Sequence, residues 1–230
     1  MELPTSMDEE ILNSYLQAGN IAAQALQYGK ELIKPEVKVV DILDKIEKKI
    51  IELEGEIAFP AQISLNEVAA HSCSDLNDQT ILQDQVVKLD VGVHVDGCIG
   101  DNALTVDLSG KYSELVKASR EALEAALKLV GPGVTLAEIG KEIHEVITSY
   151  NYAPVKNLSG HGLDEYEIHT SPSIPNFDNG NQIPLEEGMV VAIEPFASTG
   201  AGIVQESSPA TIFSLIGERP IREPITRNVL

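Results

Sequence analysis

The feature that most constrains the fold is an internal repeat. The segment Leu32–Val37 matches Leu129–Val134 at an offset of 97 residues, and an amphipathic helix follows each copy. Two copies are too few for a solenoid, so the repeat predicts a duplicated α/β half-domain with pseudo-twofold symmetry. Chance similarity of two amphipathic helix pairs is the alternative. The apolar positions of the two helices also correspond, with Ile42, Ile46 and Ile50 matching Ile139, Ile143 and Ile147.

The remaining pattern predicts a single domain over residues 1–230, because no low-complexity linker divides it. Helical periodicity and capping signals predict four helices: one capped at Ser6 and ending before Pro35, one over 38–53, one from about Ser113 to Gly131, and one that begins at a capping box, Thr135-x-x-Glu138. Strands are expected at 63–65, 87–93, 98–108, 189–193 and 211–216, with 160–187 as a loop-rich region.

Composition excludes several classes of function. The formal net charge of −20 disfavours binding to nucleic acid or to anionic lipid, because both carry negative charge. The sequence contains no run of eighteen apolar residues, and its N-terminus lacks the basic and then apolar order of a secretory signal. We therefore expect a soluble, cytoplasmic protein that attaches to no membrane.

The sharpest local feature is a hairpin with Asp90 on one arm and Asp101 on the other. If the turn residues are Val95 and Asp96, the two aspartates lie directly opposite each other; if they are Asp96 and Gly97, the aspartates are diagonal. Either register leaves both carboxylates on one face, roughly 5–8 Å apart at Cβ. Two carboxylates so close favour a cation between them or a shared proton. A solvated hairpin face is the alternative.

Two further candidate ligands lie later in the chain. His161 stands between glycines, and Glu194 ends a strongly apolar strand, where an unpaired carboxylate would be costly. A set of oxygen and nitrogen donors suits Co, Mn, Fe(II) or Zn better than a structural zinc site. The sequence contains no Gly-x-Ser-x-Gly elbow, P-loop, dinucleotide-binding fingerprint or His-Glu-x-x-His motif, which removes the main support for those classes.

Taken together, the motifs resemble those of a known family, the methionine aminopeptidases, and specifically the type 2 branch of archaea and eukaryotes. The short N-terminus is similar to that of archaeal members. The likeness extends over essentially the whole chain. Its motifs, in order, are Ala58-Phe59-Pro60, Ser64–Glu67 followed by Ala70-His71, Leu89–Gly97, Asn157–His161 and Ala192–Phe196.

This resemblance implies an α+β fold of the pita-bread type, also called creatinase/aminopeptidase-like, with pseudo-twofold duplicated halves. It also implies two divalent metal ions. In that arrangement Asp90 binds one ion, Asp101 bridges both, and His161 and Glu194 bind the other. The implied reaction is attack of water on the peptide bond that follows an N-terminal initiator methionine.

Other roles follow from the same resemblance. Glu194 takes part in proton transfer, and His71 and His169 orient the peptide and stabilise the tetrahedral intermediate. Phe59 and Ile168 resemble walls of the pocket for the methionine side chain. The implied partners are the N-termini of nascent polypeptides, met at the ribosome, and the protein is expected to be a monomer.

Two departures from the family pattern stand out. Asn102 follows Asp101 where the family commonly has a small hydroxyl residue, which affects the expected hydrogen bonding near the ligands. The family also takes a fifth ligand, a bridging Glu, from a strand after a helical insertion, and residues 217–230 resemble only the start of that insertion. We therefore expect a chain truncated at its C-terminal side, with weak metal binding and slow or no turnover.

Two other functions compete with this interpretation. A proline dipeptidase of the same fold would cleave Xaa-Pro peptides rather than Met-Ala-Ser. A non-catalytic pita-bread protein would bind other macromolecules, but it is less consistent with four retained candidate ligands. Metal titration and peptide assays separate these functions.

Overall fold

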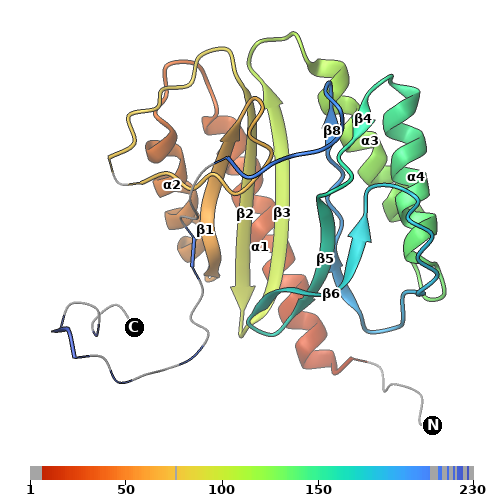
Figure 1. The fold of residues 1–230 in the computed structure, drawn as a ribbon. Coiled ribbons are helices and arrows are strands. Elements are labelled where there is room, and N and C mark those ends of the chain that lie inside the picture. Colours follow the sequence, from red (N-terminus) through yellow and green to blue (C-terminus); the bar gives the residue numbers. More distant parts are fainter. Residues whose placement is uncertain are drawn as a thin grey trace.

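The computed structural model describes residues 7–75 and 77–207, and only scattered positions after 207. Helices and strands form two layers, with the strands in front of the helices in the view of Figure 1. The first half of the chain supplies two helices and three strands, and the second half supplies the remaining elements. The predicted α+β organisation in two similar halves is therefore present.

The first half runs from helix α1 to strand β3. Its elements are α1 (Glu9–Leu32), α2 (Val39–Glu52), β1 (Glu56–Leu65), β2 (Val86–Val95) and β3 (Cys98–Asp107). The three strands form an antiparallel sheet in the order β1-β2-β3. Helix α1 packs on β2 and β3, and α2 packs on β1, so that both helices cover one face of this sheet.

The second half repeats the helix pair and adds shorter strands. Its elements are α3 (Ser113–Leu129), α4 (Leu136–Ser149), β4 (Ala153–Pro154), β5 (Ser159–Asp164), β6 (Glu167–Pro175), β7 (Val190–Ala192) and β8 (Ala197–Ser198). Strands β6, β5 and β7 form one antiparallel sheet in that order, and β4 pairs with β8. Strand β5 lies beside β3, which brings the two halves together (Figure 1).

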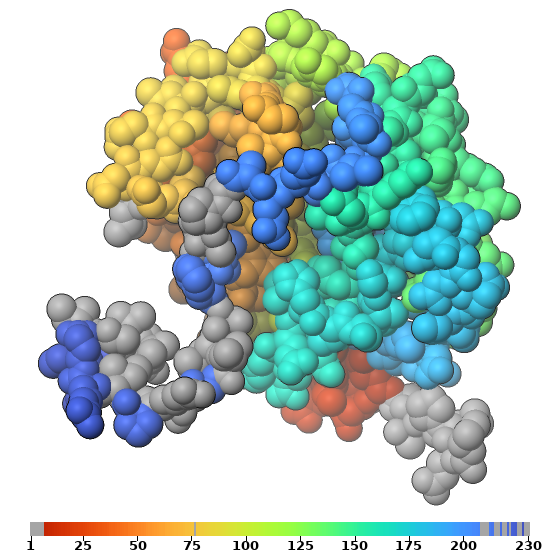
Figure 2. All heavy atoms as spheres, in the orientation of Figure 1, coloured from red at the N-terminus to blue at the C-terminus, as the bar shows by residue number. Residues whose placement is uncertain are grey.

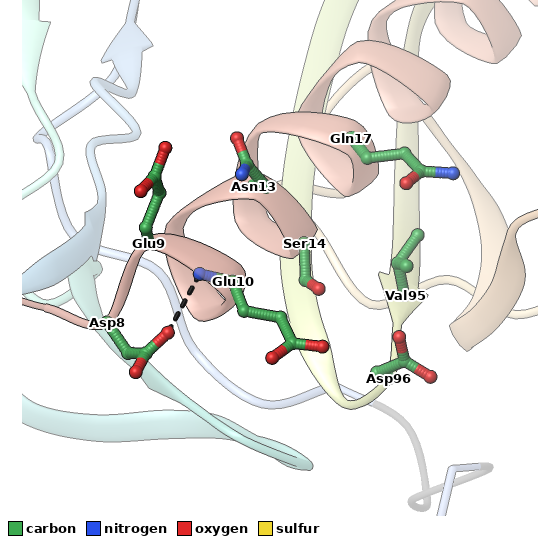
Figure 3. A pocket seen from close by; sticks show the side chains of 8 residues that line it. All are labelled: Asp8, Glu9, Glu10, Asn13, Ser14, Gln17, Val95 and Asp96. Carbon is green, nitrogen blue, oxygen red and sulfur yellow. Dashed lines mark hydrogen bonds between the residues drawn. The ribbon is translucent and has the colours of Figure 1, made fainter.

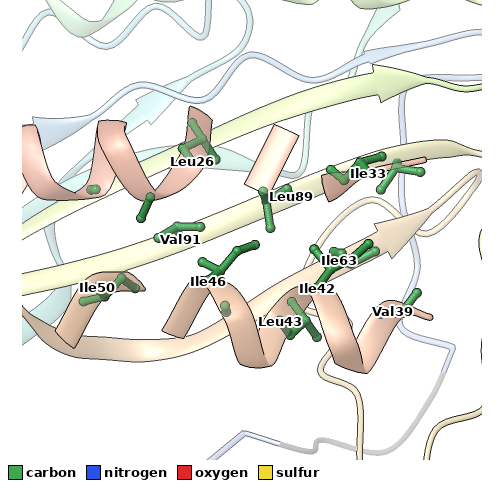
Figure 4. Packing of buried hydrophobic residues seen from close by; sticks show 14 of the residues in the cluster. Leu26, Ile33, Val39, Ile42, Leu43, Ile46, Ile50, Ile63, Leu89 and Val91 are labelled. Carbon is green, nitrogen blue, oxygen red and sulfur yellow. The ribbon is translucent and has the colours of Figure 1, made fainter. Parts of the chain in front are cut away.

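The main hydrophobic core lies between the first sheet and its helices. Figure 4 shows Ile42, Ile46 and Ile50 of α2 facing the side chains of β1 and β2. Each of these isoleucines is at most 1% exposed, and Leu89 is fully buried opposite them. The 3.6-residue period of α2 and the two-residue period of β2 thus bury one face of each element against the other.

The second half repeats this packing at the residues that the sequence repeat identifies. Ile139, Ile143 and Ile147 of α4 are all fully buried in a second core cluster. The capping box predicted at Thr135 is also present, with Thr135 Oγ1 accepting from the Glu138 N–H. The internal repeat therefore reflects two structurally equivalent units.

The equivalence extends to backbone hydrogen bonds that precede the two helices. In the first half the Glu36 N–H donates to the carbonyl of Leu82, whose own N–H donates to the carbonyl of Val37. In the second half Gly133, Leu185 and Val134 make the same two bonds. Glu36 has φ of 69° and Gly133 has φ of 90°, so both occupy the left-handed region.

Two predictions of local structure were wrong. Helix α1 is capped by Asp8, whose carboxylate accepts from the Glu10 N–H at 2.8 Å, rather than by the predicted box at Ser6. The region 160–187 was expected to be loop-rich, but its first half forms β5 and β6. Close packing of glycine explains this error: a Cβ at Gly160 would lie 2.1 Å from the Ala192 carbonyl oxygen.

Other predictions fall on parts of the chain that are not described. The strand expected at 211–216 and the insertion expected at 217–230 lie largely outside the described residues, so both remain predictions. Among the helices that the structure describes, none is both long enough and apolar enough to cross a lipid bilayer.

Candidate metal centre

The face of the first sheet that points away from its helices carries polar side chains. Leu89 and Val91 of β2 are fully buried against the helices, so the intervening Asp90 points to the other face. We call this surface the polar face. Cross-strand partners share a face, which gives three rows across β1, β2 and β3. These rows are Ser64, Lys88 and Thr105; Gln62, Asp90 and Ala103; and Phe59, Gly92 and Asp101.

The register of the hairpin decides between the two predicted arrangements of the aspartates. Val95 pairs with Cys98, so Asp96 and Gly97 are the turn residues. Asp90 therefore pairs with Ala103 and lies diagonal to Asp101, on the same face. The diagonal alternative is the one present.

A second diagonal pair comes from the other half of the chain. His161 of β5 pairs with Ala192 of β7, and Glu194 follows Ala192 by two residues. His161 Nε2 lies 3.3 Å from Glu194 Oε1 and 3.6 Å from Asp101 Oδ2. The four predicted ligands thus converge from two diagonal pairs, one in each half.

Two details of this cluster suit a cation. His161 Nδ1 lies 3.1 Å from the carbonyl oxygen of Gly162, which can only accept, so Nδ1 carries a hydrogen and Nε2 faces the carboxylates. An Nε2 lone pair in that position requires a proton or a metal ion. The Oδ1 atom of Asp90 is buried without a hydrogen-bond partner. The donor set of three carboxylates and one imidazole fits a divalent ion.

The four candidate ligands approach one another in pairs, and they do not yet surround a single point. Within residues 7–207 and the other described positions, no three His, Cys, Asp or Glu side chains are arranged around one point as metal ligands. His161 instead contacts Asp101 and Glu194 directly. The 3.3 and 3.6 Å separations nevertheless leave room for an ion, because two ligand atoms about 2.1 Å from one ion lie roughly 3.0–3.4 Å apart.

The pKa values of the cluster show that burial disfavours its negative charges. Burial, and then the charges of Asp101 and Glu194, raise the pKa of Asp90 to about 8. Burial and Glu194 likewise raise the pKa of Asp101 to about 6, against the opposing effects of His161 and of a hydrogen bond with Asp90. Burial alone would lower the pKa of His161, but its interactions with Glu194 and the Gly162 carbonyl raise it overall. Without a cation, protons compensate this cluster.

The two predicted substrate-side histidines lie next to the cluster. The ring centroid of His169 is 4.5 Å from that of His161, and the ring of His71 is 6.3 Å from that of His169. Both residues are exposed. Burial lowers the pKa of His169, and the charges of His161 and His71 lower it further. A neutral imidazole is thus favoured at the position nearest the ligands.

The two predicted pocket walls differ in how closely they lie to the ligands. Phe59 lies on the polar face, and its ring covers Gly92, where a Cβ would come within 2.1 Å of it. Since Gly92 pairs with Asp101, the ring lies beside that carboxylate. Ile168 and His169 of β6 both lie opposite the single residue Leu163 of β5, which indicates a β-bulge. A bulge of this kind changes the direction of the side chains that it contains.

The departure at Asn102 does not lie on the polar face. Its side chain points toward helix α1, where Oδ1 accepts from the Ala23 N–H at 3.3 Å while Nδ2 donates to the carbonyl oxygen of Asp101 at 2.9 Å. Adjacent strand residues point to opposite faces, so Asn102 bonds to the backbone of Asp101 and not to its carboxylate. The expected effect of Asn102 on hydrogen bonding near the ligands stays a prediction.

Sequence reasoning did not single out three residues of the polar face. Gln62 is 4% exposed with its Oε1 unpaired, and it lies directly opposite Asp90. Ser64 and Lys88 form the next row. The alternation that placed Asp90 on this face also places Lys88 there, but it gave no reason to assign Lys88 a role.

The segment after β8 passes over the polar face. Figures 1 and 2 show residues 199–206 extending from the second half across the front of the first sheet. The side chain of Asn157 holds this segment, because it accepts from the Val204 N–H at 2.9 Å and donates to the Val204 carbonyl at 2.7 Å. A segment of the second half thus passes in front of the polar face of the first half.

Another hollow lies at the base of α1 and is separate from this cluster. Figure 3 shows it lined by Asp8, Glu9 and Glu10 at the start of the helix and by Asp96 at the tip of the hairpin. It contains no histidine or second ligand type, and we assign it no function.

Comparison with known proteins defines the class. The model of metallopeptidase family M24 matches residues 13–215, and the chain therefore belongs to this family. The methionine aminopeptidase of Archaeoglobus fulgidus is 48% identical over 225 residues, which cover 97% of this chain and 77% of that protein.

Solved structures agree with the fold. The methionine aminopeptidase of Thermotoga maritima has a TM-score of 0.80 at 27% identity, covering 86% of this chain and 84% of that one. A prolidase from Pyrococcus furiosus has a TM-score of 0.72 at 25% identity and covers 83% of this chain and 57% of that one. The predicted pita-bread fold and the archaeal-like type are confirmed.

Proposed function

We propose that this chain is a methionyl aminopeptidase, a metallo-exopeptidase that removes the initiator methionine from new proteins. The observation that carries the proposal is the approach of His161 Nε2 to Asp101 and Glu194 on the face that also holds Asp90. Relatives named methionine aminopeptidase, at 40–48% identity, support this substrate over the Xaa-Pro substrates of the proline dipeptidase alternative.

We assign the metal ligands to Asp90, Asp101, His161 and Glu194, and propose two divalent ions from among Co, Mn, Fe(II) and Zn. Such ions would lower the pKa of the attacking water and polarise the scissile carbonyl. Asp101 lies between Asp90 and His161, which suits a bridging role. Glu194 is only partly exposed and can hold the proton that the water loses.

The neighbouring residues would position the peptide. The ring of His169 lies next to that of His161, and the ring of His71 lies next to that of His169, so their N–H groups can donate to the carbonyl oxygen as negative charge develops. Phe59 would provide an apolar wall for the methionine side chain beside Asp101. Ile168 would provide another, from the bulge that also carries His169.

A metal-binding experiment tests the ligand assignment independently of activity. His161→Ala should weaken Mn²⁺ or Co²⁺ binding, measured by calorimetry, by at least about tenfold. His144→Ala is the matched control, since His144 lies on α4 away from the cluster. Equal affinity of the two variants would rule out His161 as a ligand.

A peptide assay tests the reaction. With added divalent metal, the protein should release methionine from Met-Ala-Ser at the low rate expected from its sequence and leave Ala-Pro intact, and a chelator should abolish the activity. Preference for Ala-Pro would instead support a proline dipeptidase. Metal binding without cleavage of either peptide would support a non-catalytic binding protein.

We also propose that the enzyme acts as a cytoplasmic monomer on nascent chains at the ribosome. The charge of −20 makes direct contact with ribosomal RNA unfavourable, so engagement would have to occur through ribosomal proteins. Co-sedimentation with ribosomes carrying a Met-Ala nascent chain, compared with empty ribosomes, tests this location. Size-exclusion chromatography with light scattering tests the monomer.

A further inference from the structure

The loop that carries His71 is held in an unusual conformation. This loop, residues 66–72, follows β1 and is here called the His71 loop. His71 itself has φ of 60°, in the left-handed region, which a residue with a Cβ seldom adopts. A conformation of this kind persists only where the surrounding structure holds it.

Both ends of the His71 loop form hydrogen bonds with two neighbouring side chains of the polar face. At the start, the Lys88 ammonium donates to the carbonyl oxygen of Asn66 at 2.9 Å. At the end, the N–H of Ser72 donates to Ser64 Oγ at 3.3 Å. Ser64 and Lys88 are direct cross-strand partners, so a single pair of side chains fixes both ends.

The first tie is reinforced by the start of β2. Asn66 has φ of 51°, and its N–H donates to the Val86 carbonyl at 2.9 Å. Its side-chain Oδ1 accepts from the Val86 N–H at 3.0 Å. Three hydrogen bonds thus hold Asn66. Two of them join it to Val86, and the third comes from Lys88 on the polar face.

The burial of the pair indicates more than a solvated surface contact. Ser64 is 3% exposed, and Lys88 is partly buried although lysine is among the residues least often buried. The ammonium donates to a backbone carbonyl and also attracts Glu67 of the same loop. A methionine side chain would fill the same space without either interaction.

We infer that Lys88 and Ser64 are positioning residues that act through His71. By fixing both ends of the His71 loop, they keep the imidazole of His71 next to that of His169, which in turn lies against His161. This inference rests on the proposed function, because it gives His71 a role toward the substrate. Neither side chain is assigned contact with the reacting atoms.

The test compares Lys88→Met and Ser64→Ala with a matched lysine control. Lys38→Met also removes a 2.9 Å hydrogen bond from a partly buried lysine, in this case from Nζ to Gln79 Oε1, but away from the polar face. Hydrogen exchange of the Ser72 and Val68 amides should become faster in both test variants and stay unchanged in the control. Unchanged exchange in the test variants would overturn the inference, whether or not the protein is an enzyme.

A double-mutant cycle tests whether the pair acts through His71. Displacing a substrate-orienting group by about 1 Å can cost on the order of 100-fold in rate. Lys88→Met should therefore lower kcat/KM for Met-Ala-Ser by roughly 10- to 100-fold, while Mn²⁺ affinity stays within about twofold of the original. In a His71→Ala background, Lys88→Met should have almost no further effect.

The other outcomes of the cycle oppose the inference. Additive losses would show that Lys88 acts independently of His71, and weaker Mn²⁺ binding would show that it acts on Asp90. Full activity of His71→Ala would remove the role through which the pair is said to act. If the unmodified protein binds metal but cleaves no peptide, the proposed function fails, and the exchange measurement alone decides whether the pair holds the loop.

Discussion

Asp90 and Asp101 make the metal-free protein sensitive to pH. Their pKa values are about 8 and about 6 in the folded state, against 3.8 in the unfolded chain, so the folded state holds extra protons. Their contribution to stability is complete below pH 4 and is lost as the pH rises through 6 and 8. With chelator present, the free energy of unfolding in urea should fall between pH 5 and pH 7.5.

Two controls accompany this pH experiment. Asp90→Asn should flatten the decline, because the amide does not titrate. Saturating Mn²⁺ should reverse it, because an ion that binds only the folded state compensates both carboxylates. A decline that persists unchanged in Asp90→Asn would assign the effect to other groups.

Gly92 allows the Phe59 ring to lie on the polar face. A methyl group at this position would lie 2.1 Å from the ring, so Gly92→Ala should force the ring aside and reduce the free energy of unfolding by about 1–3 kcal/mol. Chemical denaturation measures this loss. Gly131→Ala serves as control, because a Cβ there would meet nothing within 4 Å. Equal stability of the two variants would contradict the close packing.

The candidate ligands could be predicted from the sequence because of strand alternation. Once Asp90 and Asp101 are placed on two arms of a hairpin, the two-residue period leaves them on one face in either register. The approach of His161 and Glu194 to this face could not be predicted in that way, because it depends on how β5 and β7 meet β3. The placement of His161 and Glu194 beside the two aspartates was instead predicted from the resemblance to methionine aminopeptidases.

At the scale of elements, the two left-handed residues before α2 and α4 are a matched pair. Glu36 in the first copy corresponds to Gly133 in the second. A left-handed residue with a Cβ costs roughly 1–2 kcal/mol, and glycine avoids this at a smaller entropic cost of about 0.5–1 kcal/mol. Glu36→Gly should therefore raise the melting temperature slightly, and Gly133→Ala should lower it. Changes of the same sign in both variants would contradict this reasoning.

The helices were predicted well and the short strands poorly. Amphipathic periodicity located all four predicted helices, since that signal is local, but among the predicted capping boxes only the one at Thr135 is present. Strand β5 was not predicted, because Gly160 and Gly162 have no side chains that could show an alternating pattern. Both positions need glycine, since a Cβ would lie 2.1 Å from a carbonyl oxygen at Gly160 and 2.3 Å from one at Gly162. Strand β1 was predicted too short because Pro60 and irregular pairing between Ile57 and Gln62 interrupt its alternation.

At the scale of the whole molecule, the two cores are equivalent but separate. Ile46→Ala and Ile143→Ala should each reduce the free energy of unfolding by about 2–5 kcal/mol, because both side chains are fully buried. Since the candidate ligands come from both halves, a saturating divalent ion should stabilise the two variants equally. Circular dichroism melting curves with and without Mn²⁺ measure this. Protection of only one variant would assign the ions to one half.

The division of the ligands between the halves has a consequence for fragments of the chain. Asp90 and Asp101 precede the connection from β3 to α3, whereas His161 and Glu194 follow it. A cut in that connection would leave each fragment with its own hydrophobic core but only one diagonal pair of ligands. Divalent metal would then act as the link between the fragments, and their reassembly would depend on its concentration.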